Sequence, residues 1–233
     1  MSATIKKLWQ SIGGKPPSFR YSEEDFRQVF QQNLETCTWE PHTLYSVFTQ
    51  YDQEYYLAQR EAFLHKYRCF YAVAKTILPR KLIELGTCAG SSADAYLSGA
   101  PEAAYIGLDV FGENVRHDDQ SPWKPYEIAK QLFKARGYKN CKLLRADLRT
   151  LERLPSKADM VVVDAAHDFE NEYADLKLAL TADPAFIFVD DAADELQAKP
   201  AIEKFLAEDL KERVDYRISI DYMGGGLVIR LKK

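Results

Sequence analysis

The stretch that decides the fold is KLIELGTCAGSSADAYL, residues 81–97. It opens with a short apolar run, which suits a strand that is buried on both faces of a parallel sheet. Gly86 and Gly90 then allow the backbone to turn tightly and to come close to a ligand. Ser91 or Ser92 can cap the helix that follows, and the free backbone amides there suit a carboxylate. The stretch therefore predicts a strand, a ligand-binding turn and a short helix.

Glu84 interrupts the apolar run of this strand. A carboxylate in a buried strand costs free energy unless it meets a partner. We therefore expect Glu84 to reach a cation or a hydrogen-bond donor at the carboxyl end of the strand.

The spacing of the glycines argues against two other ligand-binding turns. A dinucleotide fingerprint, G-x-G-x-x-G, that began at Gly86 would need glycine in place of Cys88 and Ser91. A phosphate-binding P-loop would have to end in Gly-Lys-Ser or Gly-Lys-Thr, and this turn does not. A nicotinamide-dependent oxidoreductase is therefore disfavoured.

The pattern that remains, E-x-G-x-x-x-G from Glu84 to Gly90, resembles the first motif of the class I S-adenosylmethionine-dependent methyltransferases. In that family the turn holds the amino acid end of the cofactor. The resemblance covers roughly residues 70–233 and implies a Rossmann-like α/β fold, with a mostly parallel seven-stranded sheet and a C-terminal antiparallel hairpin. It assigns cofactor binding to residues in and beside the turn, which are Glu84, Gly86, Thr87, Gly90, Ser91 and Ser92.

Length and composition indicate one globular domain with an attached segment. The chain has 233 residues, of which 46% are hydrophobic and 28% are charged. Its formal net charge is -4 and it has no long basic run, so nucleic acid is not expected as a partner. No segment is apolar for long enough to span a bilayer, and we expect no membrane partner and a cytoplasmic location. The four cysteines lack the spacing of zinc sites and suggest reduced, structural thiols.

The first 70 residues lie outside the resemblance. Glycine and proline pairs within residues 1–20 predict an irregular arm. Ser22 is expected to cap a helix, and residues 44–56 are rich in tyrosine and phenylalanine. Residues 57–78 predict a further helix with one apolar face.

These patterns divide the chain into two parts. Residues 1–70 are expected to form an arm and a helical extension that covers a substrate pocket or forms the contact of a homodimer. Residues 71–233 are expected to form the S-adenosylmethionine-binding methyltransferase domain.

Two later strands end in acids that suit recognition of the cofactor. In the strand over residues 104–109, Asp109 lies about 20 residues after the glycine turn, where nucleoside cofactors have their ribose hydroxyls bound. The next strand covers residues 141–147. At its end the methyltransferase resemblance places Asp147 near the amino group of adenine and Leu148 beside the adenine ring.

Two further apolar runs, residues 160–164 and 185–191, finish in Asp164 and in the pair Asp190 and Asp191. Strands that alternate with helices predict a parallel sheet, whose strand ends gather at one edge. These acids should therefore face the same crevice as the glycine turn.

Three carboxylates in one crevice repel each other, and a hard divalent ion removes that repulsion. Oxygen ligands favour magnesium, which would also lower the pKa of a bound substrate hydroxyl. Asp164, Asp190 and Asp191 resemble the metal ligands of small-molecule O-methyltransferases of the macrocin type, whereas the catechol type has Asp-Asn in place of the pair.

The run DAAHDFE, from Asp164 to Glu170, is similar to the D-G-D-H-x-Y-E stretch of a broad group of class I methyltransferases. The resemblance implies that His167 is a general base and that Asp164 is catalytic as well as a metal ligand. Two alanines and Phe169 depart from the motif, which weakens the analogy to particular substrates.

The remaining segments complete the pattern. Residues 111–124 form a polar connection, in which residues 117–119, His-Asp-Asp, predict a solvated loop and not a metal site. Helices are expected over residues 125–136 and 200–212, and residues 217–231 predict the closing hairpin.

Taken together, the sequence predicts a magnesium-dependent O-methyltransferase that uses S-adenosylmethionine. Its partner would be a small hydroxylated molecule, either a sugar moiety of a natural product or a catechol-like phenol. Two alternatives stay open: a metal-independent methyltransferase in which His167 alone is the base, and a non-catalytic module that binds the cofactor.

Overall fold

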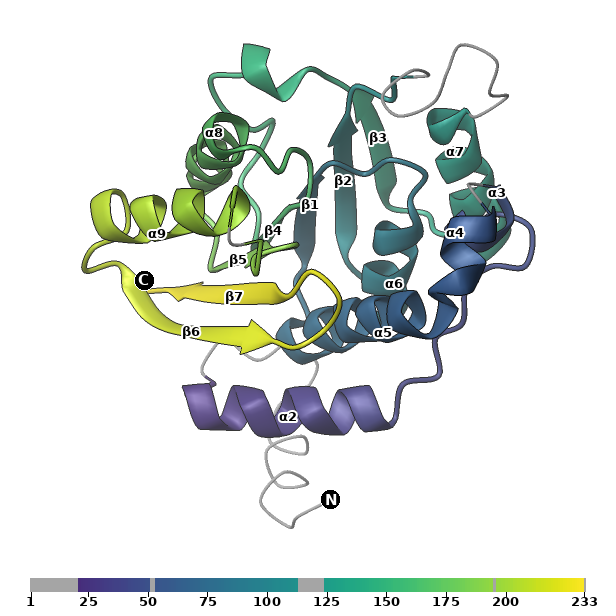
Figure 1. Cartoon of the computed structure of the whole chain (residues 1–233), viewed down its shortest axis with the longest axis horizontal. Coiled ribbons are helices and arrows are strands. Elements are labelled where there is room, and N and C mark those ends of the chain that lie inside the picture. The colour runs from purple at the N-terminus through teal and green to yellow at the C-terminus, as the bar shows by residue number, and fades with distance from the viewer. Residues whose placement is uncertain (1–20, 51–52, 113–123, 195, 233) are drawn as a thin grey trace.

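The computed structural model of the protein describes residues 21–50, 53–112, 124–194 and 196–232 (Figure 1). Two features predicted from the sequence lie outside these ranges. They are the irregular arm within residues 1–20 and the loop that holds residues 117–119.

A seven-stranded sheet forms the centre of the molecule (Figure 1). Its strands lie in the order β3-β2-β1-β4-β5-β7-β6. Strands β1 to β5 run parallel to one another, and β7 is antiparallel to both β5 and β6. The predicted mostly parallel sheet with a C-terminal antiparallel hairpin is therefore confirmed. The strands are β1 (Lys81–Leu85), β2 (Ala104–Asp109), β3 (Cys141–Arg145), β4 (Met160–Val163), β5 (Phe186–Val189), β6 (Val214–Ile220) and β7 (Gly226–Leu231).

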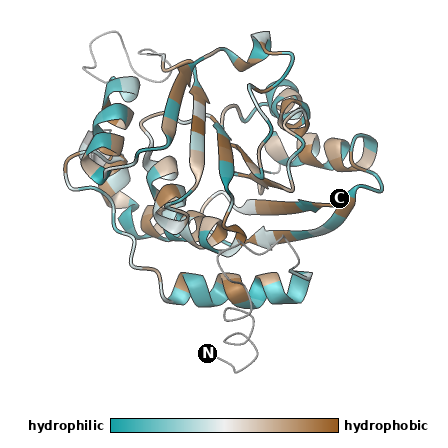
Figure 2. Cartoon of the chain, turned by 180° about the vertical axis from the view of Figure 1, so that it is seen from behind, coloured by the Kyte–Doolittle hydropathy of each residue, from teal (hydrophilic) through white to brown (hydrophobic). Residues whose placement is uncertain are grey.

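Helices cover both faces of this sheet (Figure 1). Successive side chains of a strand point to opposite faces. In β4, Met160 and Val162 pack in the core beneath α5 and α6, while Val161 and Val163 pack beneath α8 and α9. Figure 2 shows apolar residues along the central strands and mostly hydrophilic residues on α2. The helices are α2 (Glu23–Glu35), α3 (Val47–Gln50), α4 (Gln53–Ala58), α5 (Arg60–Ile77), α6 (Ser91–Gly99), α7 (Pro125–Arg136), the 3-10 turn η1 (Leu148–Thr150), α8 (Phe169–Leu180) and α9 (Ala198–Glu208).

The N-terminal helix α2 shares the core of the sheet. Ser22 caps it as predicted, because the Ser22 hydroxyl accepts a hydrogen bond from the backbone amide of Asp25 at 3.2 Å. Phe26 is fully buried, and its ring centroid lies 6.3 Å from that of Phe186 and 6.2 Å from that of Tyr216. The helix therefore packs directly on one end of the sheet.

Several predicted boundaries differ from those of the structure. The single helix expected over residues 57–78 is divided into α4 and α5 at Gln59, whose φ of -114° and ψ of 23° are not helical. The helix expected over residues 200–212 ends at Glu208. Strands β4 and β5 end before their terminal acids, so Asp164 and Asp190 lie in the loops that follow them. No helix within the described ranges has both the length and the apolar character needed to cross a membrane.

Candidate cofactor and acceptor site

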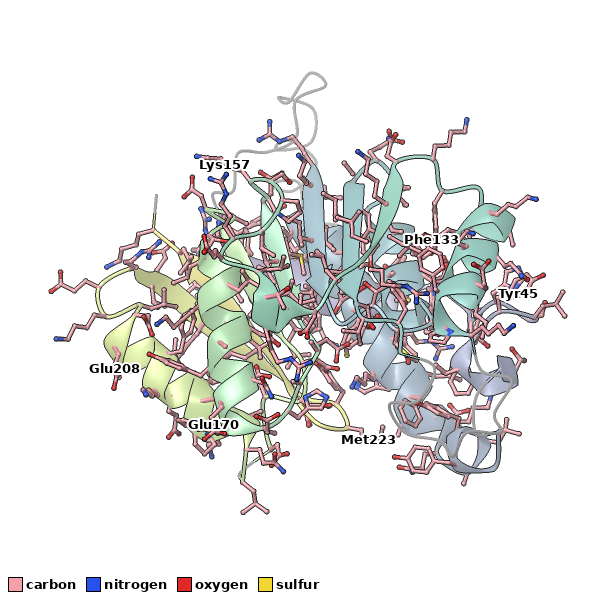
Figure 3. The ribbon with its side chains drawn as sticks, turned by 90° about the horizontal axis from the view of Figure 1, so that it is seen from above. Tyr45, Phe133, Lys157, Glu170, Glu208 and Met223 are labelled. Atoms are coloured by element: carbon pink, nitrogen blue, oxygen red, sulfur yellow. The ribbon has the colours of Figure 1, made fainter. Side chains whose placement is uncertain are left out.

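A cavity of about 710 Å³ opens where the parallel strands end. The loops after β1 to β5 line it together with α5, α8 and the turn between β6 and β7. In Figure 3, Met223 of that turn lies between Tyr45 on one flank of the molecule and Glu170 of α8 on the other. This volume lies in the range of sites that bind cofactors and small substrates.

The glycine turn after β1 has the conformation that its spacing predicts. Gly86 has a φ of +91°, and a Cβ added to it would lie 1.9 Å from the backbone oxygen of Asp164. Gly90 has a φ of +82°, and its added Cβ would lie 3.2 Å from Ala129 and from the Phe133 ring. The turn is therefore closed against the loop after β4, and glycine is needed at Gly86 for both space and backbone conformation.

Ser91 and Ser92 do not cap α6, which corrects the sequence prediction. Gly90 occupies the cap position, without a side-chain cap bond, and both serines are the first residues of the helix. They line the cavity. The Ser91 hydroxyl also accepts a hydrogen bond from the Val47 amide at 3.3 Å, which connects the N-terminal extension to the start of α6.

Glu84 accepts a hydrogen bond from a buried donor, as its place in a buried strand predicts. Its carboxylate is fully buried and accepts a hydrogen bond from the Tyr105 hydroxyl, which lies 3.1 Å from the hydroxyl of Thr87. Burial raises the pKa of Glu84 to about 7, although the hydrogen bonds from Tyr105 and Ser92 oppose the rise. Thr87 lines the cavity, whereas Glu84 lies behind the wall and supports the turn.

Asp109 links the ends of β1 and β2 at the cavity. Its Oδ2 accepts a hydrogen bond from the Cys88 amide at 2.8 Å, and its Oδ1 accepts one from the Phe111 amide at 2.6 Å. Two backbone amides therefore fix the orientation of the carboxylate. Asp109 lines the cavity, as expected of a ribose ligand.

Asp147 and Leu148 also line the cavity, in the loop after β3. The Asp147 carboxylate is held by Arg149, whose Nε and Nη2 each lie 2.8 Å from one of its oxygens. These hydrogen bonds lower the pKa of Asp147. The acid that the resemblance assigned to adenine is therefore an ionised group with a partner already in place.

The three carboxylates predicted as metal ligands line one cavity, together with a lysine that sequence reasoning missed. The Nζ atom of Lys66, on α5, lies 2.6 Å from Oδ2 of Asp190 and 3.2 Å from Oδ1 of Asp191. Asp190 also accepts a hydrogen bond from the Tyr222 hydroxyl at 2.7 Å. The part of the cavity lined by Asp164, Asp190 and Asp191 thus contains its own cation.

This arrangement moves the pKa values of both charge types. Burial alone would lower the pKa of Lys66, but the attraction of Asp190, Asp164 and Asp191 outweighs it and raises that pKa. Burial, together with repulsion from Asp190, raises the pKa of Asp164 well above its ordinary value, against the attraction of Lys66. Lys66 therefore stays protonated, and Asp164 becomes a better proton acceptor when ionised.

His167 lies beside the same acids. Its Nε2 is 3.5 Å from Oδ2 of Asp191, and its buried Nδ1 has no hydrogen-bond partner among the described residues. Across the described part of the chain, no three His, Cys, Asp or Glu side chains form a group that could hold a metal ion. With the Lys66 ammonium against Asp190, the side chains as arranged do not fit a magnesium ion.

Helix α8 adds acids that the sequence did not single out. Asp175 lines the cavity, and burial raises its pKa to about 7. Glu172 is 1% exposed, its Oε1 has no hydrogen-bond partner in the described structure, and burial raises its pKa to about 9. Both acids lie on α8, a helix that packs on the sheet, and the sequence pattern alone did not show that they are buried among apolar residues.

Aromatic side chains of α4 and α5 form part of the wall of the cavity. Tyr55, Tyr56, Phe63 and Tyr67 line the cavity. The rings of Tyr56 and Phe63 have centroids 4.5 Å apart, and those of Tyr55 and Phe63 are 6.0 Å apart. Residues 44–56 and 57–78 therefore contribute both to packing and to the wall of the cavity.

No model of a protein family and no curated protein matches the chain. Solved structures match it over nearly its whole length. The methyltransferase PaMTH1 of Podospora anserina, crystallised with S-adenosylhomocysteine, is 20% identical, with a TM-score of 0.56 over 95% of this chain and 100% of that one. The O-methyltransferase TomG of Streptomyces achromogenes, involved in tomaymycin synthesis and solved with S-adenosylmethionine, is 16% identical, with a TM-score of 0.54 over 91% and 100%.

An O-methyltransferase of Bacillus cereus in complex with S-adenosylhomocysteine is 15% identical, with a TM-score of 0.51 over 98% of this chain and 97% of that one. At these identities the likeness concerns the fold. Together with the strand order and the antiparallel β7, it establishes that the chain has the Rossmann-like class I methyltransferase fold.

Proposed function

We propose that this protein is an S-adenosylmethionine-dependent methyltransferase that methylates a hydroxyl group of a small molecule. The observation that carries the proposal is one cavity that joins the glycine turn and Asp109 to the buried acids Asp164 and Asp190. One end suits the cofactor, and the other offers proton acceptors for a hydroxyl. Solved structures of this fold with the cofactor or its demethylated product bound support the proposal.

In this proposal the cofactor lies along the ends of β1, β2 and β3. Its amino acid end meets the turn from Gly86 to Gly90 and the first amides of α6. Each oxygen of Asp109 accepts one backbone amide and retains a lone pair for a ribose hydroxyl. Asp147 and Leu148 remain the proposed neighbours of adenine.

The reaction breaks the bond between the sulfonium sulfur and the methyl carbon, forms a bond from that carbon to the acceptor oxygen, and releases the hydroxyl proton. Alignment of the oxygen with the methyl carbon removes on the order of 7 to 11 kcal/mol of the barrier in favourable cases. Asp164 and His167 are the proposed proton acceptors, because both line the acceptor end.

Magnesium dependence is a second candidate within the same function. It is favoured by the presence of Asp164, Asp190 and Asp191 in one cavity. It is opposed by the contact of Lys66 with Asp190, which leaves no free position for the ion in this arrangement. We therefore assign no step of the reaction to a metal.

The aromatic wall bears on the class of acceptor. A flat phenol can stack over its whole face on the rings of Tyr56, Phe63 or Tyr67, whereas a sugar has more hydroxyl groups that need hydrogen-bond partners beside these largely apolar surfaces. Of the two predicted acceptors, the catechol-like phenol is therefore the one we propose first. A sugar moiety remains the alternative.

The homodimer through the N-terminal helices stays a proposal. Phe26 of α2 is buried against the sheet of its own chain, and Phe63 of α5 faces the cavity, so these helices already have roles within one chain. Light scattering that shows a monomer at working concentration would remove the homodimer.

Transfer of a labelled methyl group tests the proposed function. Wild-type protein is incubated with methyl-labelled S-adenosylmethionine and a panel of phenols and glycosides. We expect label in a phenol, and a loss of about 100-fold or more in Asp164→Asn if this carboxylate takes the proton. Absence of transfer to every acceptor, combined with no binding of S-adenosylhomocysteine, would contradict the function.

A further inference from the structure

Lys66 occupies an unusual position for a lysine. It comes from α5, in the N-terminal extension, and its side chain is 12% exposed. Its Nζ lies 5.7 Å from the ring centroid of Phe70 and 5.8 Å from that of Tyr222. A lysine loses free energy on such burial unless its charge is matched. The matching charges are those of Asp190 and Asp191, which follow the carboxyl end of β5 and were predicted to be metal ligands.

The ammonium and a divalent ion would compete for the same oxygens. Magnesium requires oxygen ligands at about 2.0 to 2.1 Å in a near-octahedral arrangement. Oδ2 of Asp190 is instead in contact with Nζ of Lys66 at 2.6 Å, and its Oδ1 accepts from the Tyr222 hydroxyl at 2.7 Å. In the most buried of the three predicted metal ligands, one carboxylate oxygen thus forms an ion pair with Lys66 and the other accepts a hydrogen bond from Tyr222.

Lys66 also lies close to residues that would contact the methyl acceptor. Phe63 and Tyr67, on the same helix, line the cavity next to Lys66, and Asp164 lines it from the loop after β4. Any acceptor that reaches Asp164 therefore lies close to the lysine and to the acids that it neutralises.

We propose that the ammonium of Lys66 takes the place of the divalent ion that the sequence resemblance implied, so that the protein neutralises Asp190 and Asp191 without a metal. Neutralisation of the two acids by Lys66 does not depend on the proposed function. Only the reaction that the site would serve rests on it. Lys66 acts here as a positioning residue, which holds two acids in place beside the acceptor. Its replacement by a neutral side chain should leave Asp190 and Asp191 without a matching charge, so that a divalent ion binds there more tightly than in wild type.

Binding of Mn²⁺ to purified protein tests this exchange, because its electron paramagnetic resonance signal separates free from bound ion. The proteins are wild type, Lys66→Met, which keeps the length of the side chain, and Lys66→Arg, which keeps its charge. We expect Lys66→Met to bind one Mn²⁺ about tenfold or more tightly than wild type and Lys66→Arg. The double variant Lys66→Met with Asp190→Asn should lose that gain.

One result would overturn the proposal. It is equal Mn²⁺ affinity of wild type and a folded Lys66→Met, since the lysine would then not occupy the ion's place. If Lys66→Met does not fold, wild type and Lys66→Arg still decide, because specific Mn²⁺ binding by either contradicts the proposal and its absence in both supports it.

Titration of each variant with S-adenosylhomocysteine separates this inference from the proposed function. We expect the affinity to change by less than about threefold in Lys66→Met and Lys66→Arg, since neither touches the cofactor turn. If wild type does not bind S-adenosylhomocysteine, the proposed function is contradicted. The proposal that Lys66 takes the place of a metal ion is then tested by the Mn²⁺ measurements alone.

Discussion

The cavity has a proposed cofactor end, around the glycine turn and Asp109, and a proposed acceptor end, around Lys66 and Asp190, and the two are built in different ways. At the cofactor end, backbone groups set the geometry: the Gly86 amide donates to the Leu108 carbonyl at 2.8 Å, and Asp109 accepts from the Cys88 amide. At the acceptor end, side-chain charges set it, and Lys66 and Asp191 meet across 125 positions of the chain. The cofactor end should therefore be sensitive to backbone changes, and the acceptor end to changes of charge.

The largest expected effect is that of Gly86→Ala at the cofactor end. The new Cβ would lie 1.9 Å from a backbone oxygen of the β4 loop, and the φ of +91° disfavours alanine. We expect binding of S-adenosylhomocysteine to fall below detection and the midpoint of thermal unfolding to decrease. Calorimetry and a thermal scan measure both.

Gly137→Ala is the matched control for this substitution. Gly137 also has a positive φ, +74°, but nothing lies within 4 Å of an added Cβ. We expect it to cost about 1 to 2 kcal/mol of stability and to leave cofactor affinity unchanged. If the two variants bound S-adenosylhomocysteine equally well, close contact at Gly86 would not shape the site.

A smaller effect is expected from the buried acids beneath the two ends. Each of Glu172 and Glu84 has one oxygen without a hydrogen-bond partner among the described residues, but Glu84 also accepts a hydrogen bond from Tyr105; the pKa of Glu172 is about 9 and that of Glu84 about 7. A carboxyl whose pKa is raised on folding contributes its full stability below its unfolded value, 4.5, and loses it as the pH rises towards the folded value.

Glu172→Gln should therefore stabilise the protein at pH 8, by on the order of 2 to 4 kcal/mol, and change its stability least near pH 4. Glu84→Gln should gain less, because its folded pKa is lower and its hydrogen bonds from Tyr105 and Ser92 favour a carboxylate. Urea unfolding at both pH values measures the difference. A gain for Glu172→Gln that did not depend on pH would show that titration is not its cause.

The smallest expected effect is that of Asp147→Ala. Its carboxylate faces solvent and is already held by Arg149, so its loss removes at most one hydrogen bond to adenine. We expect affinity for S-adenosylhomocysteine to fall about threefold to tenfold. Arg149→Ala should lower the affinity for S-adenosylhomocysteine by no more than Asp147→Ala does. A loss larger than that of Asp109→Ala would make adenine, and not ribose, the main contact.

Sequence patterns predicted the fold and the glycine turn after β1. Short apolar strands, each followed by an acid or a glycine, specify where a parallel sheet ends, and Gly86 and Gly90 specify a turn that only glycine allows. Ser22 capped its helix as its local motif required. All of these features depend on neighbours in the sequence, and local spacing is enough to describe them.

The acceptor end was predicted less completely, because its partners are distant in sequence. Lys66 lies on the apolar stripe of α5, three residues after Phe63 and four before Phe70, and a lysine at such a position signals a buried partner. The stripe does not say which acid is the partner. Glu172 lies likewise on the inner face of α8, four residues before Leu176. Only tertiary packing brings these charges together.

Calorimetric titration of S-adenosylhomocysteine into wild type, Asp109→Ala and Lys66→Met tests the central claim most directly. We expect wild type to bind with a dissociation constant of about micromolar magnitude. Asp109→Ala should bind at least about tenfold more weakly, since it loses a charge-assisted contact, while Lys66→Met should bind like wild type. No binding to wild type, or an equal loss in both variants, would contradict a cofactor site built on the glycine turn and Asp109.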